Sequence, residues 1–575
     1  MTVTRTPPVC YKTGMRVALA QINPVIGDVA GNAARVRECI AAAEGQGVDL
    51  VVFSEVCLVG YPARDLLEDP ELVAENVAAV EAIARECRRV AALVGFVRPA
   101  PAGPGAPLED AAALLADGRI EGIHVKSLLP NYGAYDDPRY FRPGTGPRCS
   151  ELGGRRFGVT ICEDLWDAEA LGRQLYAIDP IARLASERVD TIVNIAASGY
   201  ERGKVARREA LLARQAKRSG ATIVYVNQVG ANDGMIFDGG SCVLSPEGRV
   251  VARAASFRSD LLVVDTRAES DTRAESEAAA GRCEPLADEM TRLTEALKLG
   301  LWDYVDKGGY PGVIVGLSDD PGSAAVATLA ADALGPQRVR ALATPRHGGD
   351  DPALAHCVRL AENLGIELEV LPVGLALEAV QGWFEATPES GEGRPAAEEL
   401  PACLRAAALS ILGRRTGRLP LVALSKTDLA LGRGAAAWGV SGALAPVGDL
   451  FEGDIARLAG HLDAGRRRIP AAMLEPCRED HARYISYGPP GGPRAGHRPG
   501  ELSPAELEEA LSRRIEQGHT ARQIAAEGFD PETVESVVRQ VERAEPARRQ
   551  APVVLEISTR AFGPGRRMPL VRKYP

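Results

Sequence analysis

Hydrophobic and polar positions alternate in blocks along the first 265 residues, in a pattern typical of strand–helix units. Amphipathic stretches such as Asn32–Glu44 and Glu71–Arg89 have the spacing of surface helices. Two apolar runs, Ala111–Ala116 and Ile120–Lys126, are joined by a short polar turn and predict a hairpin within a mixed sheet. The other predicted strands are Arg16–Ile22, Val48–Phe53, Ala91–Val97, Phe157–Cys162, Thr191–Ile195 and Thr222–Val226.

The second half of the chain alternates strands and helices more regularly. Apolar runs at Val313–Leu317 and Val339–Ala343 are each followed by a helical stretch, Ser323–Leu334 and Pro352–Leu364. Such alternation predicts a parallel, doubly wound sheet. Further predicted elements are a helix over Leu286–Lys307, strands Glu367–Val373 and Pro420–Leu424, loops Glu385–Ala397 and Gly488–Gly500, and a C-terminal helix with a capping box from Ser503.

A tandem repeat separates the two halves. The hexapeptide Asp-Thr-Arg-Ala-Glu-Ser occurs at Asp265–Ser270 and again at Asp271–Ser276. A charged duplication without aromatic residues packs poorly and is tolerated in a linker. We therefore expect a first domain over 1–265, a linker over 266–284 and a second domain over 285–575.

Composition narrows the function classes. A net charge of −10 argues against nucleic-acid binding, which requires a concentrated basic surface. No apolar run is long enough to span a membrane, and the first residues lack the core of a signal peptide. The 11 cysteines are scattered and never form a CxxC pair, and the 7 histidines do not cluster. We expect a cytoplasmic protein with free thiols and no metal site.

Three polar side chains follow apolar strands and form the candidate catalytic set. Glu55 follows the strand that ends at Phe53, Lys126 ends the hairpin, and Cys162 ends the strand that begins at Phe157. Functional residues of α/β sheets tend to lie at the carboxyl ends of strands. We expect these three side chains to meet.

A carboxylate, an ammonium and a thiol suffice for amide cleavage. Lys126 would stabilise a Cys162 thiolate, which could attack an amide carbonyl at neutral pH. Glu55 could accept the thiol proton, give it to the departing amine and later activate water. Lys126 and a backbone N–H just after Cys162 could hold the oxyanion. His124 is interpreted as a packed strand residue.

The segments around this set resemble a known family. Lys126 is followed by Leu-Pro-Asn-Tyr-Gly-Ala-Tyr-Asp-Asp-Pro-Arg-Tyr-Phe, and Cys162 by Glu-Asp-Leu-Trp. Both resemble the Glu-Lys-Cys nitrilase superfamily, specifically the glutaminase domain of glutamine-dependent NAD synthetases. The resemblance implies an α/β protein with an αββα sandwich first domain, a small-molecule amide substrate, no cofactor for amide hydrolysis and a homo-oligomer.

The same resemblance implies a glutamine pocket. Tyr61, Tyr132 and Tyr135 would line it, and Glu163 would follow the nucleophile into it. Ser198 and Lys204 belong to a segment similar to the one that holds the amino-acid end of glutamine. Two departures stand out, because Gly199 and Gly234 occupy positions where the family usually has Pro and Glu.

The second domain resembles the ATP pyrophosphatase domain of NAD synthetases, but its phosphate loop departs from the family. The family sequence Ser-Gly-Gly-x-Asp-Ser is replaced at the six positions Ser318, Asp319, Asp320, Pro321, Gly322 and Ser323. Glycine amides that would curl around phosphate oxygens are lost, and two carboxylates are added. The segments Ala423–Asp428 and Gly439–Leu444 also depart from the family pattern, with Val440 replacing a carboxylate.

We therefore expect a glutamine amidohydrolase that releases ammonia through a cysteine thioester, fused to an inactive synthetase-like domain. The alternative is a functional glutamine-dependent NAD synthetase that uses ATP and Mg²⁺ despite its atypical loop. A non-enzymatic scaffold is a third possibility, which the intact Glu55, Lys126 and Cys162 set argues against.

Overall fold

The computed structural model describes residues 15–266, 282–346, 351–386, 394–433, 442–475 and 502–572. Two compact units are present. The first comprises Met1–Asn232 and Phe237–Ala287, and the second comprises Asp233–Ile236 and Asp288–Pro575. Most of the predicted linker lies outside the described residues, so the predicted domain boundaries stay a prediction. No helix in the described ranges is long and apolar enough to cross a membrane.

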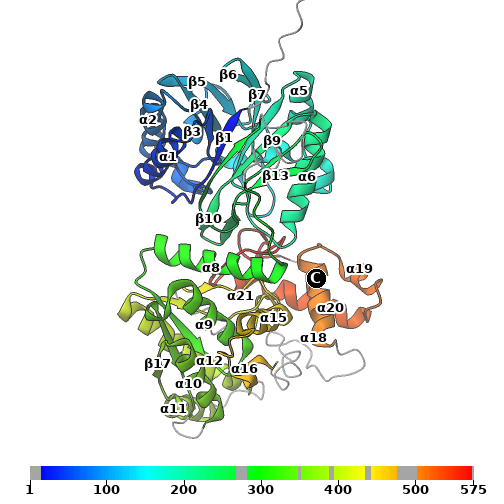
Figure 1. Cartoon of the computed structure of the whole chain (residues 1–575). Coiled ribbons are helices and arrows are strands. Elements are labelled where there is room, and N and C mark those ends of the chain that lie inside the picture. The colour runs from blue at the N-terminus through cyan, green and yellow to red at the C-terminus, as the bar shows by residue number, and fades with distance from the viewer. Residues whose placement is uncertain are drawn as a thin grey trace, which may run out of the picture. The chain divides into compact units, whose positions relative to one another are not determined.

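Two six-stranded sheets build the first unit (Figure 1). One has the order β14-β1-β2-β3-β4-β5, and the other the order β13-β12-β9-β8-β7-β6. Their strands are β1 (Arg16–Gln21), β2 (Leu50–Val52), β3 (Ala91–Pro99), β4 (Leu108–Ala116), β5 (Arg119–Val125) and β14 (Asp260–Asp265), then β6 (Arg148–Leu152), β7 (Arg155–Ile161), β8 (Thr191–Ala196), β9 (Thr222–Asn227), β12 (Cys242–Leu244) and β13 (Val250–Arg253).

The sheets pack face to face, and helices cover their outer faces. Alternate side chains such as Leu19 and Val193 belong to one buried cluster that draws on both sheets. The intervening side chains, such as Ala18, pack on helices α1 (Val29–Glu44) and α2 (Pro70–Glu86). Helices α5 (Pro180–Ser186) and α6 (Lys204–Ser219) lie beside the second sheet (Figure 1). The αββα sandwich and the predicted hairpin are confirmed.

The carboxyl ends of several parallel strands lie at one edge of each sheet. Strands β1, β2 and β3 are parallel, and so are β7, β8 and β9. Predicted strand ends at Lys126 and Cys162 are one residue too long, because β5 ends at Val125 and β7 at Ile161. The Asp164 carboxylate accepts the backbone N–H groups of Ile161, Ser127 and Leu128, which turns both chains out of their ladders.

The second unit contains one parallel sheet of order β17-β16-β15-β18-β19-β20. Helix α9 (Pro321–Leu334) packs against β15 and β16, and α12 (Arg394–Thr416) packs against β15 and β18 (Figure 1). The predicted doubly wound sheet is confirmed. The strands are β15 (Val313–Leu317), β16 (Val339–Ala343), β17 (Glu367–Val370), β18 (Leu419–Leu421), β19 (Leu444–Ala445) and β20 (Val553–Val554), and the other helices that matter below are α8 (Glu289–Lys307), α10 (Pro352–Leu364), α11 (Gly374–Ala386), α13 (Lys426–Leu431) and α18 (Pro504–Ile515).

Several predicted bounds in the second unit are corrected. The predicted loop Glu385–Ala397 is partly helical, because α11 continues to Ala386 and α12 begins at Arg394. Strand β18 ends at Leu421, since the chain then turns into α13, whose capping box is formed by Ser425 and Asp428. The capping box at Ser503 is confirmed. Val440 and the predicted loop over 488–500 lie outside the described residues.

Candidate functional site

Glu55, Lys126 and Cys162 meet inside the first unit, as predicted. The Lys126 ammonium donates hydrogen bonds to Oε1 of Glu55 and, at 2.7 Å, to Oδ2 of Asp137. Lys126 is only 1% exposed, whereas Cys162 is 8% exposed. All three residues are therefore buried, and Cys162 has the largest exposed fraction of the set.

The backbone presents Cys162 in a constrained conformation. Cys162 has a φ of 42° and begins the short 3₁₀ helix η2 (Cys162–Leu165) directly after β7. A non-glycine residue in this region is strained, and the surrounding structure must hold it there. The hydrogen bonds from Ile161, Ser127 and Leu128 to Asp164 supply that support. The turn therefore holds the Cys162 side chain directly at the end of β7.

Lys126 favours the Cys162 thiolate, as predicted, but burial outweighs its effect on the pKa of the thiol. Burial, and then the nearby Glu55 carboxylate, raise the pKa of Cys162 well above its usual range, and Lys126 only partly offsets them. Burial opposes the charge of Lys126, but the carboxylates of Asp137 and Glu55 still hold its pKa well above the usual value. A base must therefore remove the thiol proton, and the carboxylate beside it is Glu55.

Glu55 is held at both oxygens. While Oε1 accepts from Lys126, Oε2 accepts the backbone N–H of Ala197 at 2.7 Å. Ala197 directly follows β8, so a strand of the second sheet fixes a residue that follows a strand of the first. The two hydrogen bonds fix the orientation of the Glu55 carboxylate, which the sequence alone did not predict.

The predicted pocket residues divide into two groups. The Tyr132 hydroxyl donates to Glu163 at 2.9 Å, and Tyr176 donates to the same carboxylate at 2.8 Å. Burial raises the pKa of Glu163 to about 7, although both hydroxyls favour its charged form. Tyr61 forms the second group: its ring centre lies 6.4 Å from that of Tyr135, and its hydroxyl donates to Asp137 at 2.8 Å and so supports the Lys126 cluster.

Lys204 and Ser198, the two residues predicted to hold the amino-acid end of glutamine, are both buried in the first unit. The Lys204 ammonium donates to the Gly199 carbonyl oxygen at 2.8 Å and lies 6.0 Å from the Tyr135 ring centre. Burial lowers the pKa of Lys204 to about 8, while the groups that raise it include Cys162 and Glu163. A cation and an anion therefore both face the nucleophile. Ser198 is buried, and its backbone N–H donates to Asn227.

Sequence reasoning missed Asp110, Asp137 and Tyr176. Asp137 lies inside the quoted motif but had no predicted role, and Asp110 precedes the strand predicted over Ala111–Ala116. The strand β4 begins at Leu108 and carries Asp110 opposite Lys126. An acidic residue entering an otherwise apolar strand was the available signal.

Among the described residues, one cluster has carboxylates close enough to share a metal ion, namely Glu55, Asp110 and Asp137. The Lys126 ammonium already lies among these groups, within 3.4 Å of an oxygen of each. A side-chain cation therefore fills the role that a metal would take. His124 is buried and its Nε2 lies 2.8 Å from the Ser150 hydroxyl, as expected of a packed residue.

The phosphate-loop position of the second unit is filled by its own side chains. Asp320 is the N-cap of α9 and accepts the Ser323 N–H at 2.8 Å. Asp319 lies 3.0 Å from Nδ1 of His356, and Pro321 has no N–H to offer. One carboxylate about 5 Å from a phosphate charge costs roughly 3 kcal/mol at an effective dielectric constant of about 20. These residues do not fit a polyphosphate as they stand.

The second unit also contains a buried lysine, Lys426. The Lys426 ammonium donates to Ser558 at 2.7 Å and forms ion pairs with Asp449 and Glu516. Asp449 also accepts the backbone N–H groups of Ile557 and Ser558. These bonds join α13 to α18 and to the C-terminal segment, which is a structural role.

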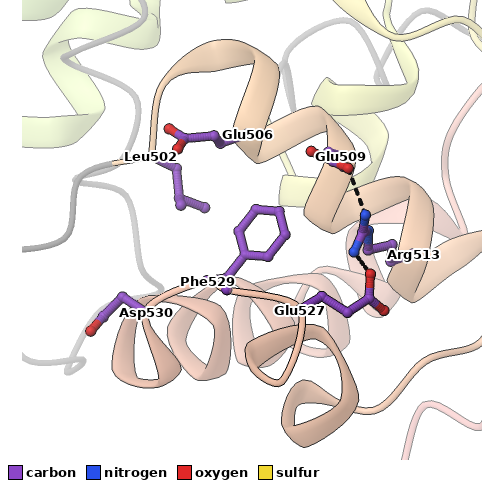
Figure 2. Close-up of a pocket in the computed structure, with 8 residues that line it drawn as sticks. Leu502, Glu506, Glu509, Arg513, Glu527, Phe529 and Asp530 are labelled. Carbon is purple, nitrogen blue, oxygen red and sulfur yellow. Dashed lines mark hydrogen bonds and ion pairs between the residues drawn. The ribbon is translucent and has the colours of Figure 1, made fainter.

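One cavity of about 370 Å³ in the second unit contains none of the predicted site residues. Figure 2 shows Phe529 at its centre and Arg513 bound to Glu509 and Glu527. Arg513 also lies over the Phe529 ring, at 5.4 Å from its centre. Two carboxylates already neutralise this arginine, so the residues described around the cavity offer no free cation.

Comparisons with known proteins cover nearly the whole chain. Residues 16–273 match the carbon-nitrogen hydrolase family, and residues 293–488 match the NAD synthase family. The chain is 32% identical to the glutamine-dependent NAD(+) synthetases of Synechocystis sp. and Thermotoga maritima, covering 97% of this chain and 99% of each relative.

Solved structures agree. The glutamine-dependent NAD+ synthetase of Acinetobacter baumannii, solved with ADP, is 30% identical over 97% of this chain and 98% of that chain, with a TM-score of 0.72. The enzyme from Cytophaga hutchinsonii, 17% identical with a TM-score of 0.78 over 97% of this chain and 98% of that one, shares the fold. With both domains matched at this identity and coverage, the chain belongs to the glutamine-dependent NAD synthetase family.

Proposed function

We propose that the first unit hydrolyses the side-chain amide of glutamine, with Cys162 as nucleophile, Glu55 as general base and acid, and Lys126 as oxyanion donor. The observation that carries this proposal is the shared buried cluster in which Lys126 binds Glu55 beside the strained Cys162. Nucleophile, base and cation each come from a different strand end, which gives the rigid support that catalysis needs.

The reaction balances without a cofactor. Glu55 takes the Cys162 proton as the sulfur attacks the amide carbon, and the oxyanion is held by Lys126 and the backbone N–H after Cys162. Glu55 then returns the proton to the departing nitrogen, which leaves as ammonia and gives a thioester. Water, deprotonated by Glu55, attacks the thioester, releasing glutamate and restoring the thiol.

The amino-acid end of glutamine carries one positive and one negative charge, and the site offers a complement to each. Glu163, held by Tyr132 and Tyr176, would bind the α-ammonium. Lys204, beside Tyr135, would bind the α-carboxylate. We propose Ser198 as a further contact to this end and Tyr61 as a wall of the pocket that also supports Lys126 through Asp137.

For the whole chain, we propose glutamine-dependent NAD synthesis, in which the released ammonia amidates the nicotinate carboxylate of deamido-NAD with consumption of ATP. The names of the relatives, matched over both domains, support this alternative over an inactive second domain. Because the loop Ser318–Ser323 does not fit a polyphosphate, we assign its residues no step in the chemistry of ATP. A homo-oligomeric cytoplasmic enzyme, as the family suggests, is part of the same proposal.

A second candidate is favoured by one specific observation. Asp320 occupies the α9 N-terminus with its own carboxylate, where a phosphate would need the amides. The second unit would then be an inactive synthetase domain, and the chain would act as a glutaminase that supplies ammonia elsewhere.

One experiment separates the two candidates. The full chain is supplied with glutamine, Mg-ATP and deamido-NAD, and glutamate, pyrophosphate and NAD are measured together. Equal amounts of all three products would support NAD synthesis, whereas glutamate alone would support the second candidate. Absence of glutamate would overturn the glutaminase proposal itself.

A further inference from the structure

Asp110 is a buried carboxyl group without the contacts that a buried charge requires. It is fully buried on β4, and neither carboxyl oxygen has a hydrogen-bond donor among the described residues. The Lys126 ammonium lies 3.4 Å from Oδ2, because its hydrogen bonds go to Glu55 and Asp137. An ionised carboxylate in such a place would be strongly disfavoured.

The charges facing Asp110 reinforce this point. Oxygens of Glu55, Asp110 and Asp137 lie within 4.8 Å of one another around a single ammonium. The groups that face Asp110 are Glu55 after β2, Lys126 after β5 and Asp137 at the start of α3 (Asp137–Tyr140). The neighbouring Glu109 pairs separately with Arg98. Three buried negative charges beside one positive charge repel, and one proton relieves the repulsion.

The hydrogen bonds indicate which group holds that proton. Glu55 accepts from Lys126 and Ala197, and Asp137 accepts from Lys126 and Tyr61. The side-chain carboxyl group of Asp110 accepts from no side chain or backbone N–H in the described part of the chain. The two groups that accept donors are stabilised as carboxylates, so the proton belongs on Asp110.

We propose that Asp110 carries a proton in the resting protein and, as a neutral hydrogen-bond donor, positions the Glu55 carboxylate. This inference rests on the proposed role of Glu55 as the base of the glutaminase reaction. Burial, and then the charge of Glu55, hold the pKa of Asp110 well above its usual range, in agreement with the geometry. A neutral carboxyl donor in an apolar site is an established way to orient a catalytic group.

The competing role for Asp110 is that of an ionised counter-charge for Lys126. The two roles make opposite predictions for Asp110→Asn, because an amide can donate a hydrogen bond but carries no charge. They also predict different vibrational signatures for the native side chain. Both differences can be measured on the full-length protein.

The first measurement is infrared difference spectroscopy of the wild-type protein against Asp110→Asn at pH 7, in H₂O and D₂O. We expect the carbonyl stretch of a protonated carboxyl group, shifted in D₂O and absent from the variant. Carboxylate stretches in its place would overturn the proposal. This result does not depend on glutamine turnover, so it decides the state of Asp110 even if the wild-type protein releases no glutamate and the proposed function fails.

The second measurement compares glutaminase rates of Asp110→Asn with those of Asp110→Leu, which has similar size and no donor. We expect Asp110→Asn to stay within about threefold of wild type and Asp110→Leu to lose about tenfold or more in kcat/KM. Equal losses in both variants would mean that the charge is needed, and would overturn the proposal. If these variants do not fold, Asp110→Ser against Asp110→Ala repeats the comparison of donor with no donor, and alkylation of Cys162 by iodoacetamide reports an intact site.

Discussion

Lys126 of the first unit and Lys426 of the second are both buried among carboxylates, and they differ in what else faces them. Lys126 binds Glu55 and Asp137 beside the Cys162 thiol, whereas Lys426 binds Asp449, Glu516 and the Ser558 hydroxyl, and this described cluster includes no thiol. Asp449 is further tied to the backbone of Ile557 and Ser558. A buried ion pair by itself therefore does not identify a catalytic site. In the first unit it is the cysteine beside the Lys126 ion pairs that points to one.

The strand ends of the two units differ in the same way. After β7, a strained turn presents Cys162, the residue of the catalytic set with the largest exposed fraction. After β15, the Ser318 hydroxyl and the Ser323 backbone N–H both donate to the Asp320 carboxylate, and the Ser323 hydroxyl donates to the Ser318 carbonyl oxygen, which closes the turn. The end of a parallel strand thus carries the proposed nucleophile in the first unit. In the second unit, the polar groups at the corresponding position are hydrogen-bonded to one another.

The largest expected effect is the loss of glutamine hydrolysis when Cys162, at the end of β7, is replaced. Cys162→Ala should lower glutamine hydrolysis by about 10⁴-fold or more, because the covalent route is lost. Glutamate release measures the rate, and the thermal midpoint serves as the control, since the substitution removes one sulfur and adds no bulk. Retention of most of the rate would remove the proposed mechanism.

Substitution of the two lysines tests the comparison directly. Lys126→Ala should lower kcat by about 10²–10³-fold, the usual effect of losing an oxyanion donor. Lys426→Ala should instead lower the free energy of unfolding by about 3–5 kcal/mol, because Asp449 and Glu516 lose their cation. Glutaminase assays below the unfolding transition and urea titrations give the two quantities. A near-wild-type rate for Lys126→Ala would mean that the catalytic set is misassigned.

The pH dependence of substrate binding tests the role of Glu163. Its pKa is raised to about 7, so its carboxylate form is lost as the pH falls below that value. If the carboxylate binds the α-ammonium of glutamine, kcat/KM should fall roughly tenfold per pH unit below about pH 7. Glu163→Gln should be weak at every pH and lack this limb. The same acid limb in Glu163→Gln would assign it to another group.

Restoring the family sequence in the loop after β15 should allow that loop to bind Mg-ATP. The fourfold variant Asp319→Gly, Asp320→Gly, Pro321→Ile and Gly322→Asp should bind Mg-ATP at least about tenfold more tightly than wild type, because glycine amides replace the carboxylates at positions 319 and 320 and the loop loses one carboxylate net. Calorimetry on both full-length proteins measures the difference. Equally tight binding by the wild-type protein would show that its loop rearranges around the nucleotide.

The smallest expected effect concerns the cap of α9. Asp320→Ala should lower the free energy of unfolding by about 0.5–2 kcal/mol, since the Ser323 N–H loses its acceptor. Asp319→Ala is the matched control, with an expected loss of about 0–1 kcal/mol, because its ion pair with His356 is partly exposed. Chemical denaturation compares them, and a larger loss for Asp319→Ala would contradict the proposed cap.

Much of the fold followed from sequence because hydrophobic periodicity is a local property. The strands β15 and β16 and the helix α10 have the predicted bounds, and the doubly wound sheet follows from their alternation with helices. The catalytic set could be predicted because Glu55, Lys126 and Cys162 each follow an apolar strand within a specific motif. The departures in the loop Ser318–Ser323 were equally visible in the sequence.

Only the tertiary structure decided how those groups act. The register of β4 against β5 places Asp110 opposite Lys126, and the end of β8 brings the Ala197 N–H to Glu55. Burial raises the pKa of Cys162 despite the adjacent lysine, a balance that the sequence did not reveal. Residue type and strand position are written in the chain, but desolvation and charge balance depend on segments that meet only after folding.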